Sequence, residues 1–419
     1  MAGASNRIAG KLPLAWLSMA LTAALPQAAR ADDAASPMWT FGGFGTVGLV
    51  HSDARDADFS STVLKAHGAG FSGSTSIDVD TRVGAQLGLN LNKQWSAVLQ
   101  VISEHRIENT YNPIVEWGFV KYQATPDLSL RLGRIALPIF VAAEYRKAAY
   151  AFPWVRTPVE VYGAIPITNS DGIDVTYRWN VGAVKNVTQA FYGYNNVHTG
   201  TSRVKARGLG GVSNTTEVGA ASARVSVLTT DLSVDLARAL FDAFRQFGPQ
   251  GVQIAEQYDV DHKQALGVSI GATYDPGEWF VMGEIGRLDA KSYLGDKTAA
   301  FVSAGYRYNN FTPYVSFARV KANSSITSPG LSLAGLPPQV AGAAAVLNAT
   351  LNGLLSTIAV QSSSTIGLRW DFMRNVALKL QQERVQPKGA SSGMLINVQP
   401  GFQYGRAVNA TSVALDFVF

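Results

Sequence analysis

The segment between Ile139 and Ser170 carries a dense mixture of charged, aromatic and proline residues. Its candidate functional residues are Glu144, Arg146, Lys147, Arg156 and Glu160. Charges of both signs could attract or repel ions and polar solutes, because fixed charges act on mobile ones in a narrow space. The same residues could also form a surface loop that only covers the mouth of a larger structure. Their role therefore depends on the elements that hold them.

Residues for covalent, metal or cofactor chemistry lack the patterns that such chemistry needs. The five histidines are His51, His67, His105, His198 and His262. They have neither metal-ligand spacing nor a convincing Ser or Asp partner, and the chain has no cysteine. Gly43 to Gly48 matches a dinucleotide-binding fingerprint, but no strand precedes it and no helix follows. We expect no enzyme activity, no metal and no cofactor.

The carboxyl-terminal residues 411–419 alternate between apolar and polar side chains. One face of an extended strand holds Val413, Leu415, Phe417 and Phe419, and the other holds Ser412, Ala414 and Asp416. The same alternation runs through residues 77–90. One such strand would suit a one-sided soluble sheet. Repeated along the chain, the alternation predicts strands with one face toward lipid and one toward water.

Tight turns and long connections follow one another in a regular order. Turn residues mark tight turns at 92–94, 125–127, 180–182, 229–231, 275–277, 309–310 and 374–375. Long connections fall near 53–76, 107–113, 139–170, 199–215, 241–261, 290–297, 323–361 and 388–407. Together they join about 16 strands, with both ends of the chain on the tight-turn side. The sequence therefore predicts an all-β, transmembrane antiparallel β-barrel with short periplasmic turns, long outer loops and one loop folded inward.

Residues 1–31 have the pattern of a signal peptide. Arg7 and Lys11 precede a short apolar run, and the run is followed by an A-x-A cleavage site that ends at Ala31. An uncleaved anchor is the alternative, but the apolar run is short for a bilayer. We expect residues 32–419 to form the barrel. Without the leader the net charge falls below the +5 of the whole chain, so nothing indicates a nucleic-acid partner.

The charged faces of the strands should line the interior of the barrel. A charge on the lipid face would cost roughly 2–4 kcal/mol near mid-membrane. The predicted wall residues are Asp78, Asp80, Arg82, Glu104, Arg106, Arg131, Asp174, Arg178, Glu284, Arg307, Arg369, Asp371, Lys379 and Glu383. Arg131 and Arg134 cannot both follow strict alternation, so one should lie at a bulge or near a strand end. Acidic and basic residues nearly balance, and the preferred sign of ion is left open.

Two stretches of the long connections have helical character. Apolar residues between Val340 and Val360 recur at helical spacing, and polar residues such as Asn348 would be costly in hydrocarbon. An amphipathic helix within the loop 325–360 is the better interpretation, although its role is not indicated. Residues 240–248 resemble one or two helical turns closed by Gly248.

Three motifs bear a family resemblance. They are Arg82-Val83-Gly84 followed by Gln86-Leu87-Gly88-Leu89, then Arg131-Leu132-Gly133-Arg134 before a long loop, and the terminal Phe419. With these motifs the chain resembles Gram-negative outer-membrane porins of the 16-stranded general-diffusion type, over nearly all of residues 32–419. The resemblance implies a homotrimer and a third outer loop, here 139–170, that narrows the pore. The acidic Pro-Glu-Phe-Gly-Gly motif of enteric porins is absent, so their usual electrostatics are not carried over.

The resemblance implies passive transport across the outer membrane. A water-filled channel would admit small hydrophilic solutes and ions, and the expected partners are outer-membrane lipid and lipopolysaccharide. A substrate-selective porin for phosphate or small organic acids is the alternative within the same class. An outer-membrane adhesin or hydrolase belongs to other classes, and a hydrolase would need a Ser–His pair that the sequence does not offer.

Overall fold

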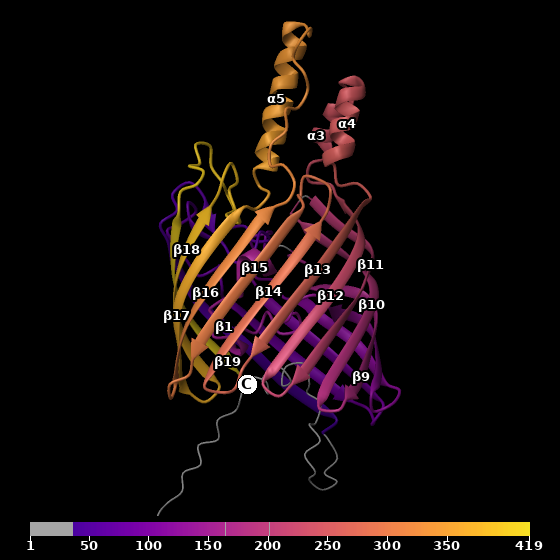
Figure 1. The fold of residues 1–419 in the computed structure, drawn as a ribbon, viewed down its shortest axis with the longest axis vertical. Helices are drawn as coiled ribbons and strands as arrows, with labels where there is room; N and C mark the ends of the chain where they lie inside the picture. Colours follow the sequence, from indigo (N-terminus) through magenta and orange to yellow (C-terminus); the bar gives the residue numbers. More distant parts are fainter. Residues whose placement is uncertain (1–36, 164, 201) are drawn as a thin grey trace, which may run out of the picture.

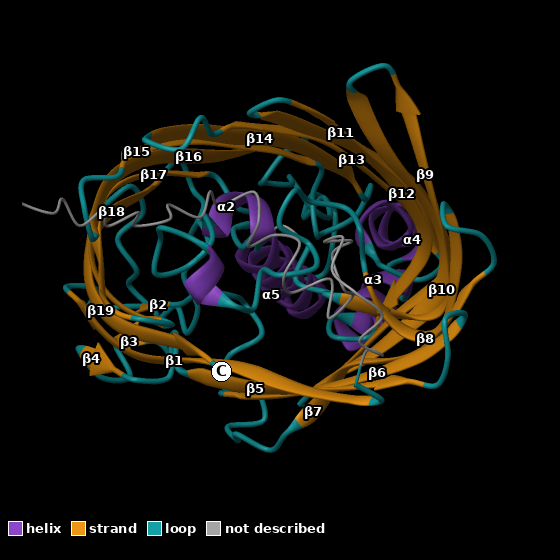
Figure 2. Cartoon of the chain, turned by 90° about the horizontal axis from the view of Figure 1, so that it is seen from below, coloured by secondary structure: helices purple, strands orange, loops and turns teal. Residues whose placement is uncertain are grey.

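The computed structural model describes residues 37–163, 165–200 and 202–419, in which sixteen antiparallel strands close into a barrel (Figures 1 and 2). The barrel strands are β1 (Trp39–Ser52), β5 (Arg82–Asn90), β6 (Trp95–Glu104), β7 (Ile114–Gln123), β8 (Leu128–Ala136), β9 (Asn169–Val181), β10 (Val184–Thr199), β11 (Ser202–Val218), β12 (Ala221–Val234), β13 (Lys263–Tyr274), β14 (Trp279–Asp289), β15 (Lys297–Tyr306), β16 (Phe311–Ala322), β17 (Gln361–Met373), β18 (Val376–Pro387) and β19 (Val408–Val418). β1 pairs with β5 on one side and with β19 on the other, which closes the ring. The predicted signal peptide, residues 1–31, lies outside the described residues.

Shorter elements decorate the barrel. Two strands, β2 (Asp58–Phe59) and β3 (Ala69–Gly70), pair with each other, and β4 (Thr75–Ser76) pairs with the upper end of β1. The helices are η1 (Ala149–Ala151), α2 (Val159–Tyr162), α3 (Arg238–Arg245), α4 (Gly248–Tyr258) and α5 (Pro338–Leu355). None of the helices in the described ranges is long and apolar enough to cross a membrane.

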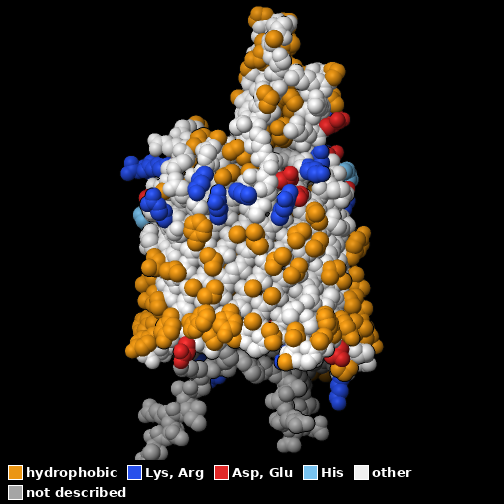
Figure 3. All heavy atoms as spheres, in the orientation of Figure 1, with side chains coloured by type: hydrophobic (Ala, Val, Ile, Leu, Met, Phe, Trp, Pro, Cys, Tyr) orange, Lys and Arg blue, Asp and Glu red, His pale blue; other side chains and the backbone are white. Residues whose placement is uncertain are grey.

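The side chains alternate as the sequence predicted. On β19 the exposed Val413 follows Ser412 and precedes Ala414, both of which are buried. Figure 3 shows one face of the same arrangement, with apolar side chains spread over the strands and a row of Lys and Arg side chains above them. An apolar exterior of this kind suits a bilayer.

The seam between β1 and β19 explains the glycine-rich start of β1. A Cβ on Gly45 would lie 2.3 Å from the ring of Phe417, and one on Gly43 would lie 2.4 Å from the ring of Phe419. The Gly43 N–H also donates to the Phe419 carbonyl at 3.0 Å. The fingerprint-like glycines thus let the terminal aromatic rings lie flat on the neighbouring strand, as aromatic side chains do over strand glycines elsewhere.

Six of the seven predicted tight turns lie at or beside strand connections, and the seventh is wrong. Thr229 and Thr230 lie inside β12, and the real turn is at 219–220, where Gly219 has a φ of +57°. Threonine is β-branched and favours strands, which is why the chain stays extended through Thr229 and Thr230. The predicted long loop 199–215 is also wrong, because it lies largely in β11. The glycines of β11 at Gly208 and Gly210 coincide with a bulge rather than a loop.

The predicted strand 77–90 is too long at its start. β5 begins at Arg82, and residues 77–81 form a turn in which the Thr81 N–H donates to the Ile77 carbonyl at 3.3 Å. Val79, which continued alternation from Ile77 would place on the apolar, lipid-facing side, is fully buried. The side chain of Ser76 accepts a hydrogen bond from the Asp78 N–H at 3.0 Å, which favours a local turn over continued pairing.

Two of the long outer connections form a helical protrusion above the barrel (Figure 1). It consists of α3, α4 and α5, which share a buried cluster that includes Phe241, Phe244 and Leu351. The helices predicted near 340–360 and 240–248 are thereby confirmed as α5 and α3. Gly248 begins a second helix, α4, that the sequence did not indicate.

Candidate pore and its inward segment

The connection between β8 and β9 lies inside the barrel, as predicted, and carries η1 and α2 into the lumen (Figure 2). We call residues 137–163 and 165–168 the inward segment. Trp154, only 1% exposed, stacks on Phe152 at 5.4 Å between ring centroids and meets Phe301 of β15 edge-on at 5.7 Å. Its indole N–H donates to Ser303 Oγ at 2.8 Å. An aromatic core therefore attaches the segment to one side of the wall.

Arg156 attaches the segment to a second part of the wall through buried charge. Its guanidinium forms ion pairs with Asp80 at 2.6 Å and with Glu383 of β18 at 2.8 Å. It also donates to Ser412 Oγ of β19 at 2.6 Å and lies over the ring of Phe59 at 4.9 Å. These groups are almost completely buried, so removing any one of the three charges would leave the others without full compensation for the cost of their desolvation.

Two wall cations bind the backbone carbonyls of the inward segment. Lys379 Nζ, which is fully buried, donates to the carbonyls of residues 149 and 154, both at 2.7 Å, and pairs with Asp416 at 2.6 Å. Arg369 donates to the carbonyls of residues 150 and 152 at 2.6 and 2.8 Å and pairs with Asp371. An irregular segment leaves buried carbonyls without strand partners, and these cations supply the missing donors.

Strands β12 to β14 and β17 complete the attachment. Arg224 of β12 pairs with Glu144 at 3.1 Å and donates to the carbonyl of residue 138. Glu284 of β14 accepts a hydrogen bond from the Tyr162 hydroxyl at 3.1 Å. Glu160 Oε1 accepts one from Gln361 Nε2 at 2.7 Å. The inward segment is thus attached along the wall from β12 to β19, which we call the packed side.

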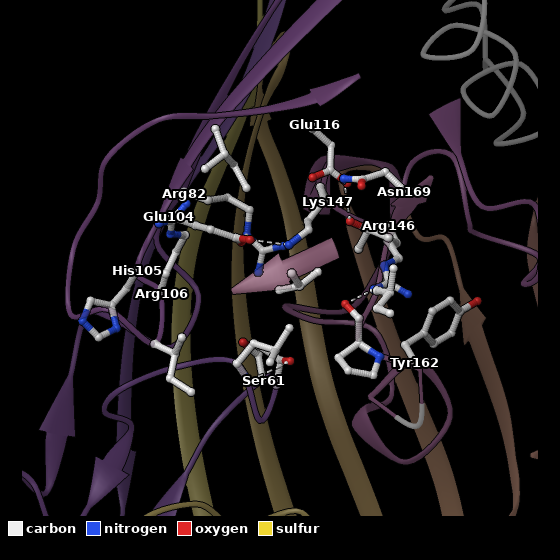
Figure 4. A pocket seen from close by; sticks show the side chains of 18 of the residues that line it. Ser61, Arg82, Glu104, His105, Arg106, Glu116, Arg146, Lys147, Tyr162 and Asn169 are labelled. Atoms are coloured by element: carbon white, nitrogen blue, oxygen red, sulfur yellow. Dashed lines mark hydrogen bonds and ion pairs between the residues drawn. The ribbon is translucent and has the colours of Figure 1, made fainter. Parts of the chain in front are cut away.

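A cavity of about 390 Å³ remains between the inward segment and the wall from β5 to β10 (Figure 4). We call this cavity, together with the wall from β5 to β10, the open side. Lys147 of the inward segment and Arg82 of β5 both contact Glu104 of β6, the arginine at 3.9 Å. Within the described residues, Arg146 donates hydrogen bonds only to the carbonyls of residues 165 and 166, at 3.5 and 3.3 Å. Glu116 and the amide side chains of Asn169 and Asn195 are also among the lining residues.

The outer connection 53–81 closes over the cavity and contains a buried lysine. Lys65 donates to the carbonyls of residues 78 and 105 at 2.7 and 3.1 Å. Burial lowers the pKa of Lys65 to about 8, an effect partly opposed by the nearby Glu104 carboxylate. Ser61 and Thr62 of the same connection line the cavity.

The structure divides the predicted site residues between the two sides. Of the inward-segment residues, Arg146 and Lys147 line the open cavity, whereas Glu144 and Glu160 bind the packed wall; Arg156 lies at the boundary and is neutralised. The wall residues on the packed side are Glu284, Arg369, Asp371, Lys379 and Glu383. Asp80, in the turn 77–81, pairs with Arg156 at the boundary. Those at the open cavity are Arg82, Glu104 and Arg106.

The remaining predicted wall residues lie toward the ends of the barrel. Asp78 lies in the outer turn 77–81 and accepts a hydrogen bond from Tyr111. Arg307 pairs with Asp275 between two periplasmic turns.

Arg131 binds Asp174 at 2.9 Å inside the lower lumen, and Arg178 lies on the same face of β9 as Asp174. Arg134, three residues from Arg131, pairs instead with Asp171 at 2.7 Å near the outer end of the strands.

Sequence reasoning missed several interior residues. Arg224 was missed because the wrongly predicted turn at 229–231 divides β12, so the alternation of inward and outward side chains along that strand was not followed. Lys121 alternates with Val120 and Tyr122 on β7, so the period-two pattern could have placed it inside. Glu116 shares the interior with the adjacent Trp117 at a bulge between β6 and β7, a local irregularity that no alternation rule anticipates.

The closed sixteen-strand barrel matches the fold of solved outer-membrane porins and channels. An anion-selective porin from Comamonas acidovorans is 13% identical, with a TM-score of 0.54 over 91% of this chain and 99% of that one. The outer-membrane channel DcaP of Acinetobacter baumannii is 11% identical, with a TM-score of 0.53 over 91% and 97%. Salmonella typhi OmpF, solved in complex with daunomycin, is 12% identical, with a TM-score of 0.53 over 91% and 97%. No protein-family model and no curated protein matches the sequence.

Proposed function

We propose that the protein is an outer-membrane porin that lets small hydrophilic solutes and ions diffuse passively through the open side of its lumen. The observation that carries the proposal is the division of the interior. The packed side is filled by the inward segment, whereas the open side keeps a polar, charged cavity. A barrel with an apolar exterior and a narrowed, hydrated interior selects solutes by size and charge.

The cellular setting is part of the same proposal. Cleavage near Ala31 would release residues 32–419 for insertion into the Gram-negative outer membrane, in contact with its lipid and lipopolysaccharide. A homotrimer follows from the family resemblance. The charged inward segment and wall would act on solutes without making bonds, so the proposed activity needs neither catalytic residues nor a cofactor.

A substrate-selective porin is the second candidate. Arg146 favours it: this residue lines the cavity, and its hydrogen-bond partners among the described residues are carbonyl oxygens. A guanidinium without a carboxylate partner can bind a phosphate or an organic acid. Block of single-channel current by added phosphate or by a small dicarboxylate would distinguish selective binding from free diffusion.

Planar-bilayer recording tests the main proposal. Residues 32–419, refolded in detergent and added to a salt solution beside the bilayer, should give stepwise increases in conductance. The same protein, heat-denatured in the same detergent, is the control. Absence of conductance from protein that has regained the compact, heat-modifiable gel mobility of a barrel would contradict the proposal.

A further inference from the structure

The open side of the lumen carries more positive than negative charge. Its cationic residues are Arg82, Arg146 and Lys147 at the cavity, and Lys121, Arg131 and Arg178 on the lower part of the same wall. Its carboxylates are Glu104, Glu116 and Asp174. Two further pairs, Arg106 with Glu108 at 3.1 Å and Arg134 with Asp171 at 2.7 Å, each cancel. Arg156 also lines the cavity, but it is paired with two carboxylates. The near balance of charges in the sequence as a whole therefore does not hold along this face.

Most of the negative charge on this face is already bound. Glu104 is shared by two cations, Lys147 and Arg82. Asp174 accepts hydrogen bonds from Arg131 at 2.9 Å and from Gln189 at 3.0 Å. A mobile cation would have to displace these partners, so neither carboxylate is an open cation site.

Three of the cations have no carboxylate partner. Throughout the described ranges, no ion pair involves Lys121, Arg146 or Arg178. Arg146 lies in the upper lumen beside the cavity, and Lys121 lies on the lower wall, directly across from Arg131 in the β7–β8 pairing. Glu116, 4% exposed, and Glu104 are nearby carboxylates that offset part of the charge of Arg146 without forming an ion pair with it. Positive charge without a bound counter-ion thus occurs at two levels of the lumen.

The acidic groups of the packed side do not restore the balance for a passing solute. Asp80 and Glu383 form ion pairs with Arg156, and Asp416 forms one with Lys379. All of these side chains are fully or almost fully buried. Arg156 itself lines the edge of the cavity, but Asp80, Glu383 and Asp416 are not among the described residues that line it. Buried, paired charges project a weaker field than unpaired ones in contact with water.

From this charge distribution we infer that the pore prefers anions, with small carboxylates and phosphates as the favoured solutes. Arg146 forms an upper anion-attracting position, and Lys121 forms a lower one. Unpaired cations in a narrow lumen raise the local concentration of anions and lower that of cations. The inference rests on the proposed channel function and adds the sign of the preferred ion and the residues that determine it.

Reversal potentials in a KCl gradient across a planar bilayer test the inference. The intact protein should pass chloride more readily than potassium. Arg146→Gln and Lys121→Gln should each lower the chloride-to-potassium permeability ratio, and the double variant should lower it further. Arg146→Lys, which keeps the charge, should retain most of the preference. Arg287→Gln is the matched control, because Arg287 lies on the outer surface and pairs with Asp289 at 2.9 Å.

Each result of the experiment decides between defined alternatives. A channel that prefers potassium, or whose permeability ratio is unchanged in Arg146→Gln and in Lys121→Gln, would overturn the inference and leave the channel function intact. A folded protein without any conductance would instead refute the proposed function. The two residues lie on different elements, so if one variant fails to fold, the other still gives the answer. Inorganic phosphate should reduce potassium chloride current in the intact protein more than in the double variant.

Discussion

The two sides of the barrel interior use the same residue types in opposite ways. On the packed side, arginine, lysine and acidic side chains are buried and bind one another or the carbonyls of the inward segment. On the open side, cations such as Arg146 line a cavity and have no carboxylate partner. The difference shows that pairing, rather than residue type, distinguishes a structural charge from one available to a solute.

The physical reason lies in access to water. A charge removed from water must be compensated by partners at short distance, or its desolvation cost exceeds any benefit. The packed side meets this requirement, as with Arg156 and its two carboxylates. The open side needs fewer partners, because water in the cavity solvates its charges.

The largest expected effect follows from removing Arg156. Arg156→Leu would leave Asp80 and Glu383 buried without their cation, and breaking a buried pair in this way costs roughly 3–5 kcal/mol. We expect the inward segment to detach from β18 and β19, so that the packed side becomes part of an enlarged pore. Single-channel conductance should rise, and the folded barrel should lose its compact gel mobility at a lower temperature. Arg287→Leu on the outer surface should change neither measurement. Unchanged conductance and heat stability in Arg156→Leu would show that the buried ion pairs of Arg156 do not hold the inward segment in place.

A smaller effect is expected at Lys379, where the loss can be partly reversed. Lys379→Met leaves Asp416 buried, with Thr46 at 2.6 Å as its one side-chain hydrogen-bond donor in the part of the chain that the structure describes. It also removes the donor to two segment carbonyls. The double variant Lys379→Met/Asp416→Asn removes the unpaired charge but not the lost carbonyl bonds. It should therefore recover part of the heat stability lost in the single variant. A double variant less heat-stable than Lys379→Met would show that the unpaired charge of Asp416 is not the cause of the stability lost in the single variant.

The sequence was sufficient to predict the barrel but not the partners inside it. Period-two alternation placed Arg82, Lys379 and Arg369 on the interior, since a strand fixes which face each residue occupies. It could not show that Arg156 meets residues 76 and 227 positions away, because those contacts depend on the path of an irregular segment. Nor could it separate the open from the packed side. That division arises from aromatic packing such as Trp154 on Phe301, between elements far apart in the sequence.

The smallest expected effect concerns the open side alone. Glu104→Gln keeps the shape of the side chain but removes the charge shared by Lys147 and Arg82. The inward segment is attached mainly along the packed side, so conductance should change little. The chloride-to-potassium permeability ratio should rise, because two more cations lose their bound counter-charge. Asp289→Asn, which removes a carboxylate from the outer surface, is the matched control and should leave the ratio unchanged. A lower permeability ratio in Glu104→Gln would mean that the Glu104 carboxylate does not neutralise the cations that face the solute. The distinction between paired and unpaired charges would then not hold for the open side.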